Sequence, residues 1–230
     1  MSEIRYSIER TRNRTSRAVL RDGMIQIRLA RGLPPAEEQR HIQSLLKRMS
    51  KAYLKDATKK RLDPFRSLFT GEQSVTTNLA TGSLLSFRVQ DGRRNKALQV
   101  WGGWSVLRGL NTDDRTFHRF LWKLLAKSAH KEIEALVRSI NAETYNEHIS
   151  AVTLKYMRSR WGSCSHTGVI ALSTPLLFTT PEILRYVIIH ELAHLQHPNH
   201  SAHFWQHVAL HSPDHVRIRK LLLGFKLPKA

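Results

Sequence analysis

Two histidines and a glutamate in the last quarter of the chain have the residue types and the spacing of a metal site. The run His190-Glu191-Leu192-Ala193-His194 places the histidines four residues apart. On a helix, this spacing leaves both imidazoles on one face, about 6 Å apart along the axis, so both can reach a single Zn²⁺. Glu191 projects from another side, where it can contact a metal-bound water without being a ligand, as a general base must. The pattern therefore indicates a metal site that activates water.

A third ligand is expected beyond the helix, where histidines are frequent. His200 lies six residues after His194 and just past Pro198, at which the helix must end. The chain can turn there and bring the His200 imidazole to the metal. His197 is an alternative third ligand, but it lies two helical turns from His190. We expect His190, His194 and His200 to hold the metal. The motif indicates Zn²⁺ as the cofactor, although imidazole sites accept several first-row ions.

The segment that carries the motif is predicted to be a buried helix beginning at Thr180-Pro181. Thr179 or Thr180 can cap it, proline suits the first turn, and Glu182 can complete a capping box. Apolar residues cover most of its circumference: Ile183, Leu184, Val187, Ile188, Leu192 and Leu195. Histidines on so apolar a helix would be buried polar groups that need partners, and a metal supplies them. This favours a metal site over a histidine-rich surface without one.

More histidines follow on the next predicted helix, which Ser201 can cap. His203, His207 and His211 form a row at four-residue intervals. We expect most of them to support the metal ligands or to face solvent. One of them, or Tyr186 one turn before His190, could stabilise an oxyanion.

The elements that must position these residues are predicted from hydrophobic periodicity and turn residues. Near the N-terminus we expect a meander of strands at 4–9, 16–21 and 24–30, with Asp22-Gly23 as a hairpin turn, and then a helix over 36–54. Strands and turns follow over 70–108, an amphipathic helix over 114–140, and strands over 149–160 and 168–173. This order predicts an α+β fold with a β-rich N-terminal part.

Composition limits the class of protein. The 230 residues include one cysteine, Cys164, which excludes a disulfide framework and favours the cytoplasm. No apolar run reaches the roughly 18 residues of a membrane span, so we expect no membrane partner. The net charge is +19, and residues 1–62 hold 16 Lys and Arg against 6 acids. This basic segment is either a solvated surface or a patch for nucleic acid or acidic partners.

Several stretches of this sequence resemble the YgjP-like metallopeptidase family, which is related to the SprT-like zinc metalloproteases. The resemblance rests on Met157–Ser165 (MRSRWGSCS), Gly168–Leu172 (GVIAL), Tyr186–His194 (YVIIHELAH), Asn199–Ser201 (NHS), Phe204-Trp205 and Ser212–Asp214 (SPD). It is specific from about 115 to 225 and weaker over 1–114. One departure is Ser173, where the family usually has Asn.

The resemblance implies a single domain over residues 1–230, with a basic β-rich part over 1–114 and a zincin-like catalytic core of helices and strands over 115–230. It also implies a zinc-dependent peptidase with His190, His194 and His200 as ligands and Glu191 as catalytic base. The substrate would be a protein or peptide, held extended by main-chain hydrogen bonds to an edge strand beside the site. We expect this strand to be Val169, Ile170, Ala171 and Leu172.

Two other functions fit the same sequence. In the first, the chain is a nucleic-acid-associated protein whose basic surface is the main function, with protease activity that depends on DNA or is absent. A structural zinc site usually has four ligands and is rich in cysteine, so a three-histidine site favours catalysis. In the second, the chain is an inactive relative that acts as an interaction module, against which the intact Glu191 argues.

Overall fold

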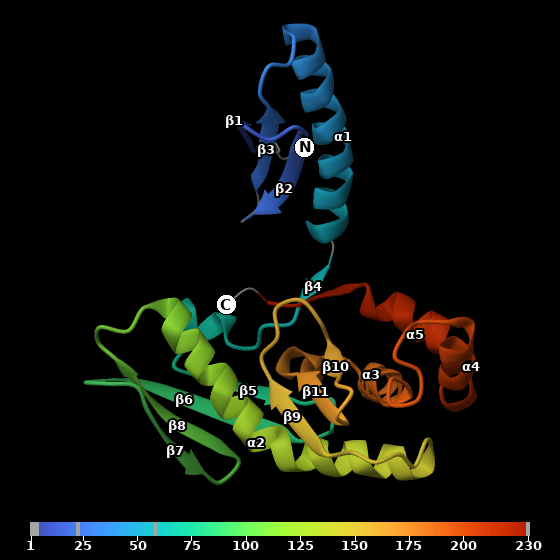
Figure 1. Cartoon of the computed structure of the whole chain (residues 1–230). Helices are drawn as coiled ribbons and strands as arrows, with labels where there is room; N and C mark the ends of the chain where they lie inside the picture. The colour runs from blue at the N-terminus through green and yellow to red at the C-terminus, as the bar shows by residue number, and fades with distance from the viewer. Residues whose placement is uncertain (1–4, 22–23, 58, 229–230) are drawn as a thin grey trace. The chain divides into compact units, whose positions relative to one another are not determined.

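The chain folds into two compact units, residues 1–59 and 60–230, each with its own apolar core (Figure 1). This computed structural model describes residues 5–21, 24–57 and 59–228. The strands between residues 74 and 109, which we grouped with the N-terminal part, belong to the second unit. Within the described residues, no helix combines the length and apolar character that crossing a membrane requires.

The first unit is a three-stranded sheet covered by one long helix. It consists of β1 (Tyr6–Thr11), β2 (Arg17–Arg21), β3 (Met24–Ala30) and α1 (Pro35–Ala57). The helix packs against β2 and β3, and its apolar face contributes Ile42, Leu45, Leu46 and Met49 to the core of this unit. The predicted strands and helix are therefore confirmed.

The predicted meander is wrong, because β3 lies in the middle of the sheet. The strand order is β1-β3-β2, with β3 antiparallel to β2 but parallel to β1. Ile25, Ile27 and Leu29 on β3 are fully buried, whereas most residues of β1 are exposed. The most apolar strand takes the central position, where it loses most water contact. The predicted turn at Asp22-Gly23 lies outside the described residues.

The second unit begins with a four-stranded sheet. The strands β5 (Ser74–Asn78), β6 (Leu84–Gly92), β7 (Lys96–Val100) and β8 (Gly103–Gly109) lie in the order β5-β6-β8-β7. The pair β6 and β8 is parallel and the other pairs are antiparallel. The strands and turns predicted over 70–108 are confirmed. Before this sheet come β4 (Lys60–Arg61) and a 3₁₀ turn (Arg66–Phe69), and β4 pairs with β12 (Phe225–Lys226) near the end of the chain.

The long helix α2 (Asp114–Glu143) joins the two sheets of this unit. Asp113 caps it, because its carboxylate accepts hydrogen bonds from the Thr116 backbone N–H at 2.9 Å and from the Thr116 hydroxyl at 2.7 Å. The buried face of α2, which includes Leu121, Leu125 and Ile133, packs against β8, β9 and α3. The opposite face is left to solvent.

The second sheet and the remaining helices form the region that carries the motif. The strands are β9 (Ala151–Lys155), β10 (Gly162–Cys164) and β11 (Val169–Ser173), in the order β10-β11-β9. A 3₁₀ turn (Thr174–Phe178), α3 (Pro181–Ala193), α4 (Ala202–His211) and α5 (His215–Leu222) follow. The fold class is α+β, as predicted, although α5 was not foreseen.

Candidate metal centre

The helix α3 carries the motif and starts where the sequence predicts. The Thr180 hydroxyl accepts a hydrogen bond from the Ile183 N–H at 3.3 Å, so Thr180 is the cap. The Thr179 hydroxyl instead donates to the Leu176 carbonyl at 2.7 Å. The helix ends at Ala193, before the proline that we expected to stop it. His194 therefore sits at the C-terminal cap of α3 rather than within it.

Three imidazoles converge beyond the end of α3. One ligand atom each of His190, His194 and His200 lies within 4.8 Å of the others. The Nε2 atoms of His190 and His200 are 3.1 Å apart. Nitrogen ligands bound to a tetrahedral metal ion at about 2.0 to 2.1 Å are about 3.3 to 3.4 Å from one another. The histidines therefore lie close to the spacing that one ion requires.

The hydrogen bond of His194 settles which of its nitrogens can face a metal. Its Nδ1 lies 3.0 Å from the His197 carbonyl oxygen, which can only accept, so Nδ1 carries the proton and Nε2 keeps a free lone pair. His197 thus contributes its backbone. Its own Nε2 is buried without a hydrogen-bond partner among the described residues. His200, and not the alternative His197, converges with His190 and His194.

Burial keeps two of the ligand candidates, His190 and His194, uncharged. Burial, together with charge repulsion from the nearby His194 and His200, lowers the pKa of His190 from 6.5 to about 3. Burial also lowers the pKa of His194, although its bond to the His197 carbonyl opposes this. A neutral imidazole is the form that binds a metal ion, so both rings are ready to bind at neutral pH.

A phenylalanine from α4 supports all three imidazoles. Phe204 is fully buried, and its ring centroid lies 5.0, 4.6 and 4.8 Å from those of His190, His194 and His200. The Ser201 hydroxyl caps α4 by accepting a hydrogen bond from the Phe204 N–H at 3.3 Å. The expected cap is confirmed, and it fixes the start of the helix that carries this ring.

The neighbouring Trp205 supports the third histidine from its outer side. Its ring lies 5.6 Å from that of His200 at an interplanar angle of 26°, which is a stacked arrangement. The guanidinium of Arg219 on α5 lies 5.0 Å from the same tryptophan ring. His200 is exposed and lies outside the helices, so the contacts of its ring with Phe204 and Trp205 of α4 hold it in place, and Arg219 of α5 covers Trp205. Apart from their place in the family resemblance, nothing in the sequence indicated a role for Phe204 and Trp205.

Glu191 is buried and points from α3 toward β10. A Cβ atom on Gly162 of β10 would lie 2.5 Å from Oε1 and 2.7 Å from Cδ of Glu191. Only glycine therefore allows the strand to approach this carboxylate so closely. Burial raises the pKa of Glu191 from 4.5 to about 8, and the positive charge of Arg160 acts against the rise. A carboxyl group that titrates near neutral pH is suited to proton transfer.

The expectation that Val169 to Leu172 form an edge strand is wrong. β11 is the middle strand of its sheet, and Ala171 pairs with Ser163 on one side and Thr153 on the other. Ile170, Ala171 and Leu172 are buried, as expected for a strand covered on both sides and paired at both edges. The edge beside Glu191 is β10, which is short and has glycine, serine and cysteine instead of a strong strand pattern.

The second histidine row and Tyr186, which we expected to support the metal ligands or an oxyanion, lie in two different places. His207 and His211 lie beside Tyr145, with ring centroids 6.5 and 4.7 Å away, and His207 also contacts His197. Among the described residues, no ring contact joins the second histidine row to the three converging imidazoles. Tyr186 is buried on α3, 6.0 Å from His190 between ring centroids, and burial raises its pKa.

The departure at Ser173 has a clear structural role. Its side chain is fully buried, and its hydroxyl contacts the backbone nitrogen of Met157 at 3.3 Å and the carbonyl of the same residue at 3.4 Å. Its own backbone N–H donates to the Trp161 carbonyl at 2.8 Å. Ser173 therefore ties the end of β11 to the segment that leads into β10.

Two solved structures are similar to part of the chain. Over 43% of its length the chain is similar to the crystal structure of the metallopeptidase zymogen abylysin of Pyrococcus abyssi, of which it covers 98%, with 20% identity and a TM-score of 0.32. Over 39% of its length it is similar to that of the metallopeptidase zymogen jannalysin of Methanocaldococcus jannaschii, of which it covers 93%, with 23% identity and a TM-score of 0.33. No curated protein matches the chain.

The family comparison covers most of the molecule. A model of the YgjP-like metallopeptidase domain matches residues 13–223, a span that includes parts of both units and the whole metal centre. The chain therefore belongs to the YgjP-like metallopeptidase family and is a metallopeptidase, a hydrolase that depends on a catalytic metal.

Proposed function

We propose that the protein is a zinc-dependent peptidase in which His190, His194 and His200 hold the metal and Glu191 is the general base. The observation that carries the proposal is the convergence of three imidazoles next to a buried carboxyl group. The ligand atoms are within 4.8 Å of one another and two of the rings are kept neutral by burial, so the residues fit a zinc ion.

Glu191 would carry out the proton transfers of the reaction. When bound, zinc polarises a carbonyl group and lowers the pKa of water. Glu191 would take the proton from the attacking water and pass it to the amine that leaves. The raised pKa of this carboxyl group suits both steps, because a group that titrates near neutral pH gains and loses a proton at similar cost.

The substrate would lie along β10. This strand is at the edge of its sheet and contacts Glu191 through Gly162, so a peptide added there would pass the catalytic carboxyl group. Main-chain hydrogen bonds to an edge strand hold an extended peptide whatever its sequence. A protein or peptide substrate, a single domain over residues 1–230 and a cytoplasmic location belong to the same proposal.

The test combines metal content with hydrolysis, measured on chelator-washed protein reloaded with zinc. We expect about one zinc per chain by elemental mass spectrometry and a large loss of zinc in His200→Ala. Glu191→Gln should keep its zinc but cleave a fluorescently labelled unfolded protein about 10² to 10⁴ times more slowly, since it lacks the base.

Glu182→Gln is the matched control, because Glu182 lies on the same helix but is exposed and pairs with Arg217. It should keep both zinc and activity. A well-folded parent that retains no zinc would overturn the metal assignment. An undiminished rate in Glu191→Gln would overturn the role of the glutamate.

A further inference from the structure

A row of basic side chains follows the exposed face of α2. Arg119, Lys123, Lys127 and Lys131 recur at every fourth residue, and all four are exposed. Positions four apart on a helix are about 6 Å apart along the axis, so the row is about 18 Å long. Between Asp114 and Glu132 the helix contains no acidic residue. The row is therefore a regular line of positive charge without acidic residues of α2 between its members.

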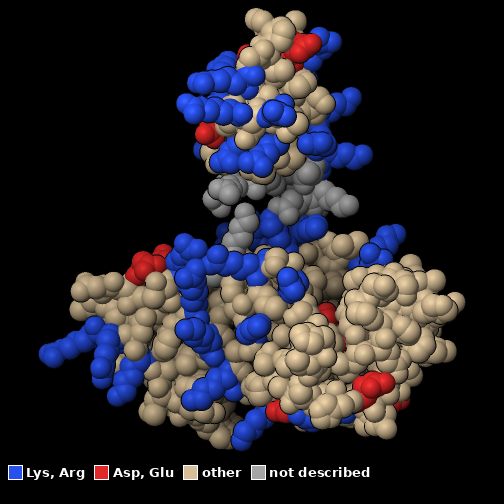
Figure 2. Space-filling view, in the orientation of Figure 1, with Lys and Arg blue, Asp and Glu red and all other residues tan. Residues whose placement is uncertain are grey.

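The surface beside this row is hollowed into a groove. Three cavities of about 480, 590 and 230 Å³ lie along α2. The first two share Ala126 and Leu154, and the second and third share Gln99 and Ser128, so the cavities are neighbours along α2. The first half of the basic row lines the first cavity, and the second half lines the second. Figure 2 shows Lys and Arg gathered over the first half of α2.

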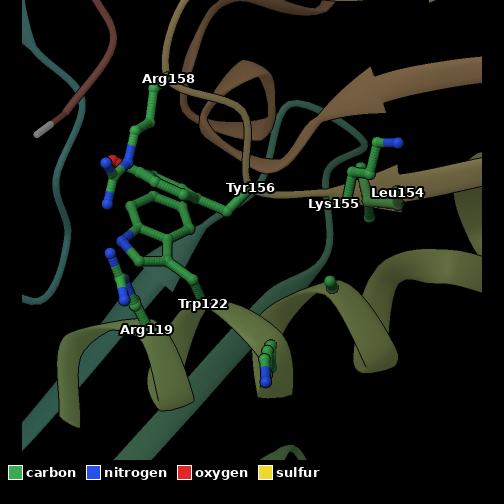
Figure 3. A pocket seen from close by; sticks show the side chains of 8 residues that line it. Arg119, Trp122, Leu154, Lys155, Tyr156 and Arg158 are labelled. Carbon is green, nitrogen blue, oxygen red and sulfur yellow. The ribbon is translucent and has the colours of Figure 1, made fainter. Parts of the chain in front are cut away.

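Two arginines converge at the first cavity. In Figure 3, Arg119 of α2 and Arg158 of the segment after β9 point toward each other beside the rings of Trp122 and Tyr156, while Lys155 points away. The two rings pack together with centroids 5.2 Å apart and form a firm wall. None of the described residues that line this cavity is acidic. Guanidinium groups on one opening favour a phosphate, whose oxygens match their fork of donors.

An exposed tryptophan lies in the turn that borders the third cavity. Trp101 lies in the turn between β7 and β8 and has a relative exposure of 102%. Its chain neighbours Val100 and Gly102 line the third cavity, so Trp101 belongs to the turn that borders this cavity. A tryptophan side chain buries more area than most and is rarely left in water without a role. Its free faces are suited to stacking on another flat ring.

We propose that this α2 groove binds single-stranded nucleic acid. The basic row would follow the phosphates, the two arginines would hold one of them, and Trp101 would stack on a base. A regular row of single charges suits a backbone with one charge per repeat, and bases are free to stack only where the strand is unpaired. A purely acidic peptide such as polyglutamate offers the charge but has no rings to stack. The groove lies beside β9, at the opposite edge of the sheet from β10, so the proposal does not depend on the peptidase mechanism.

The experiment uses the full chain and a fluorescently labelled 20-nucleotide oligothymidylate, with binding measured by anisotropy over a series of salt concentrations. The double variant Lys123→Gln/Lys127→Gln should bind about tenfold more weakly at low salt, and its plot of log affinity against log salt should be shallower by about 1.4. Trp101→Ala should bind roughly five- to a hundredfold more weakly with an unchanged salt slope, because it removes stacking and no charge.

A matched control separates the groove from the overall charge of +19. Arg88→Gln/Lys220→Gln removes the same charge from β6 and α5, at exposed positions that do not line the groove. It should change the affinity less than twofold. Lys123→Arg/Lys127→Arg keeps the charge and should bind like the parent, which shows that a loss in the glutamine variant is electrostatic. Melting temperature and zinc content should match the parent in every variant.

Three results would overturn the proposal. An equal loss in the control variant would mean that diffuse charge binds the oligonucleotide. Unchanged binding by Trp101→Ala would remove the stacking site. Binding of duplex DNA or polyglutamate as tightly as the single strand would assign the groove to another class of polyanion.

Discussion

At the scale of single residues, the contact between Gly162 and Glu191 restricts where the carboxyl group that we propose as the base can lie. A Cβ atom at position 162 would lie 2.5 Å from the carboxylate, so a larger residue there would push the glutamate out of its place. Gly162→Ala should therefore displace Glu191 and lower the rate of hydrolysis about 10²-fold, since a shift of about 1 Å can have that effect.

The matched control for this prediction is Ser163→Ala in the same strand, which leaves position 162 unchanged. It should cleave at the parental rate. Zinc content by elemental mass spectrometry should be normal in both variants, because the three histidines are not displaced. Full activity in Gly162→Ala would show that β10 tolerates the extra methyl group and that the close approach has no role.

Glu191 should also make the stability of the metal-free protein depend on pH. Its pKa rises from 4.5 in the unfolded chain to about 8 on folding, so between these values the folded protein holds more protons than the unfolded one. The free energy of unfolding must then fall as pH rises through this range. The pKa of His190 is instead lowered on folding, which has the opposite effect, but only below its ordinary value of 6.5.

Between pH 6.5 and 8, the change in the free energy of unfolding therefore reports on Glu191 and not on His190. In chelator, the free energy of unfolding should fall by up to about 2 kcal/mol across this window, as measured by urea denaturation. Glu191→Gln cannot ionise and should show a much flatter profile. A parent that gains stability toward pH 8 would contradict the burial of this carboxyl group.

The motif residues were predictable because their relation is local. His190 and Glu191 lie in the last turn of α3 and His194 is its C-terminal cap, so their spacing alone places them. Gly162 acquires its role only where β10 meets α3, a contact between segments 29 residues apart in the sequence. Its signal in the sequence was a glycine at a strand end, which is typical of many turns.

At the scale of elements, α4 and α5 hold the third histidine in place. Trp205→Ala would remove the ring that stacks on His200 and is itself covered by Arg219. We expect zinc affinity to fall about 10- to 100-fold, because losing a group that orients a ligand typically has this effect. Competition with a fluorescent zinc chelator measures the change.

Two further variants test whether the ring acts by stacking. Trp205→Phe keeps an aromatic ring and should recover most of the affinity, whereas Gln206→Ala, at the next and exposed position of α4, should change nothing. If Trp205→Ala binds zinc as tightly as the parent, His200 is held by other contacts.

Helices were easier to predict than strand order. The apolar spacing of α1 and α2 marks one face of a helix whatever lies beside it, and both helices are where the sequence predicts them. Strand pairing depends on partners that are distant in the chain. The central places of β3 and β11 follow from their burial on folding, and an alternating or apolar run is compatible with either an edge or a middle position.

At the scale of the whole molecule, two separate cores predict that the catalytic part can fold alone. Residues 60–230 contain the three converging histidines, the four-stranded sheet, the three-stranded sheet of β9 to β11, and α2. A fragment of these residues should bind one zinc per chain and melt within a few degrees of the parent's catalytic unit, as followed by calorimetry. An unfolded fragment would show that residues 1–59 are part of the same cooperative structure.

The pairing of β4 with β12 has a consequence for how the second unit could be rearranged. These strands bring residues 60–61 beside 225–226, so the two ends of the unit meet in space. A short linker could join them, and the chain could be opened at an exposed turn elsewhere with every strand pair preserved. The unit is thus a natural subject for circular permutation, in which the order of its elements along the chain changes while their neighbours do not.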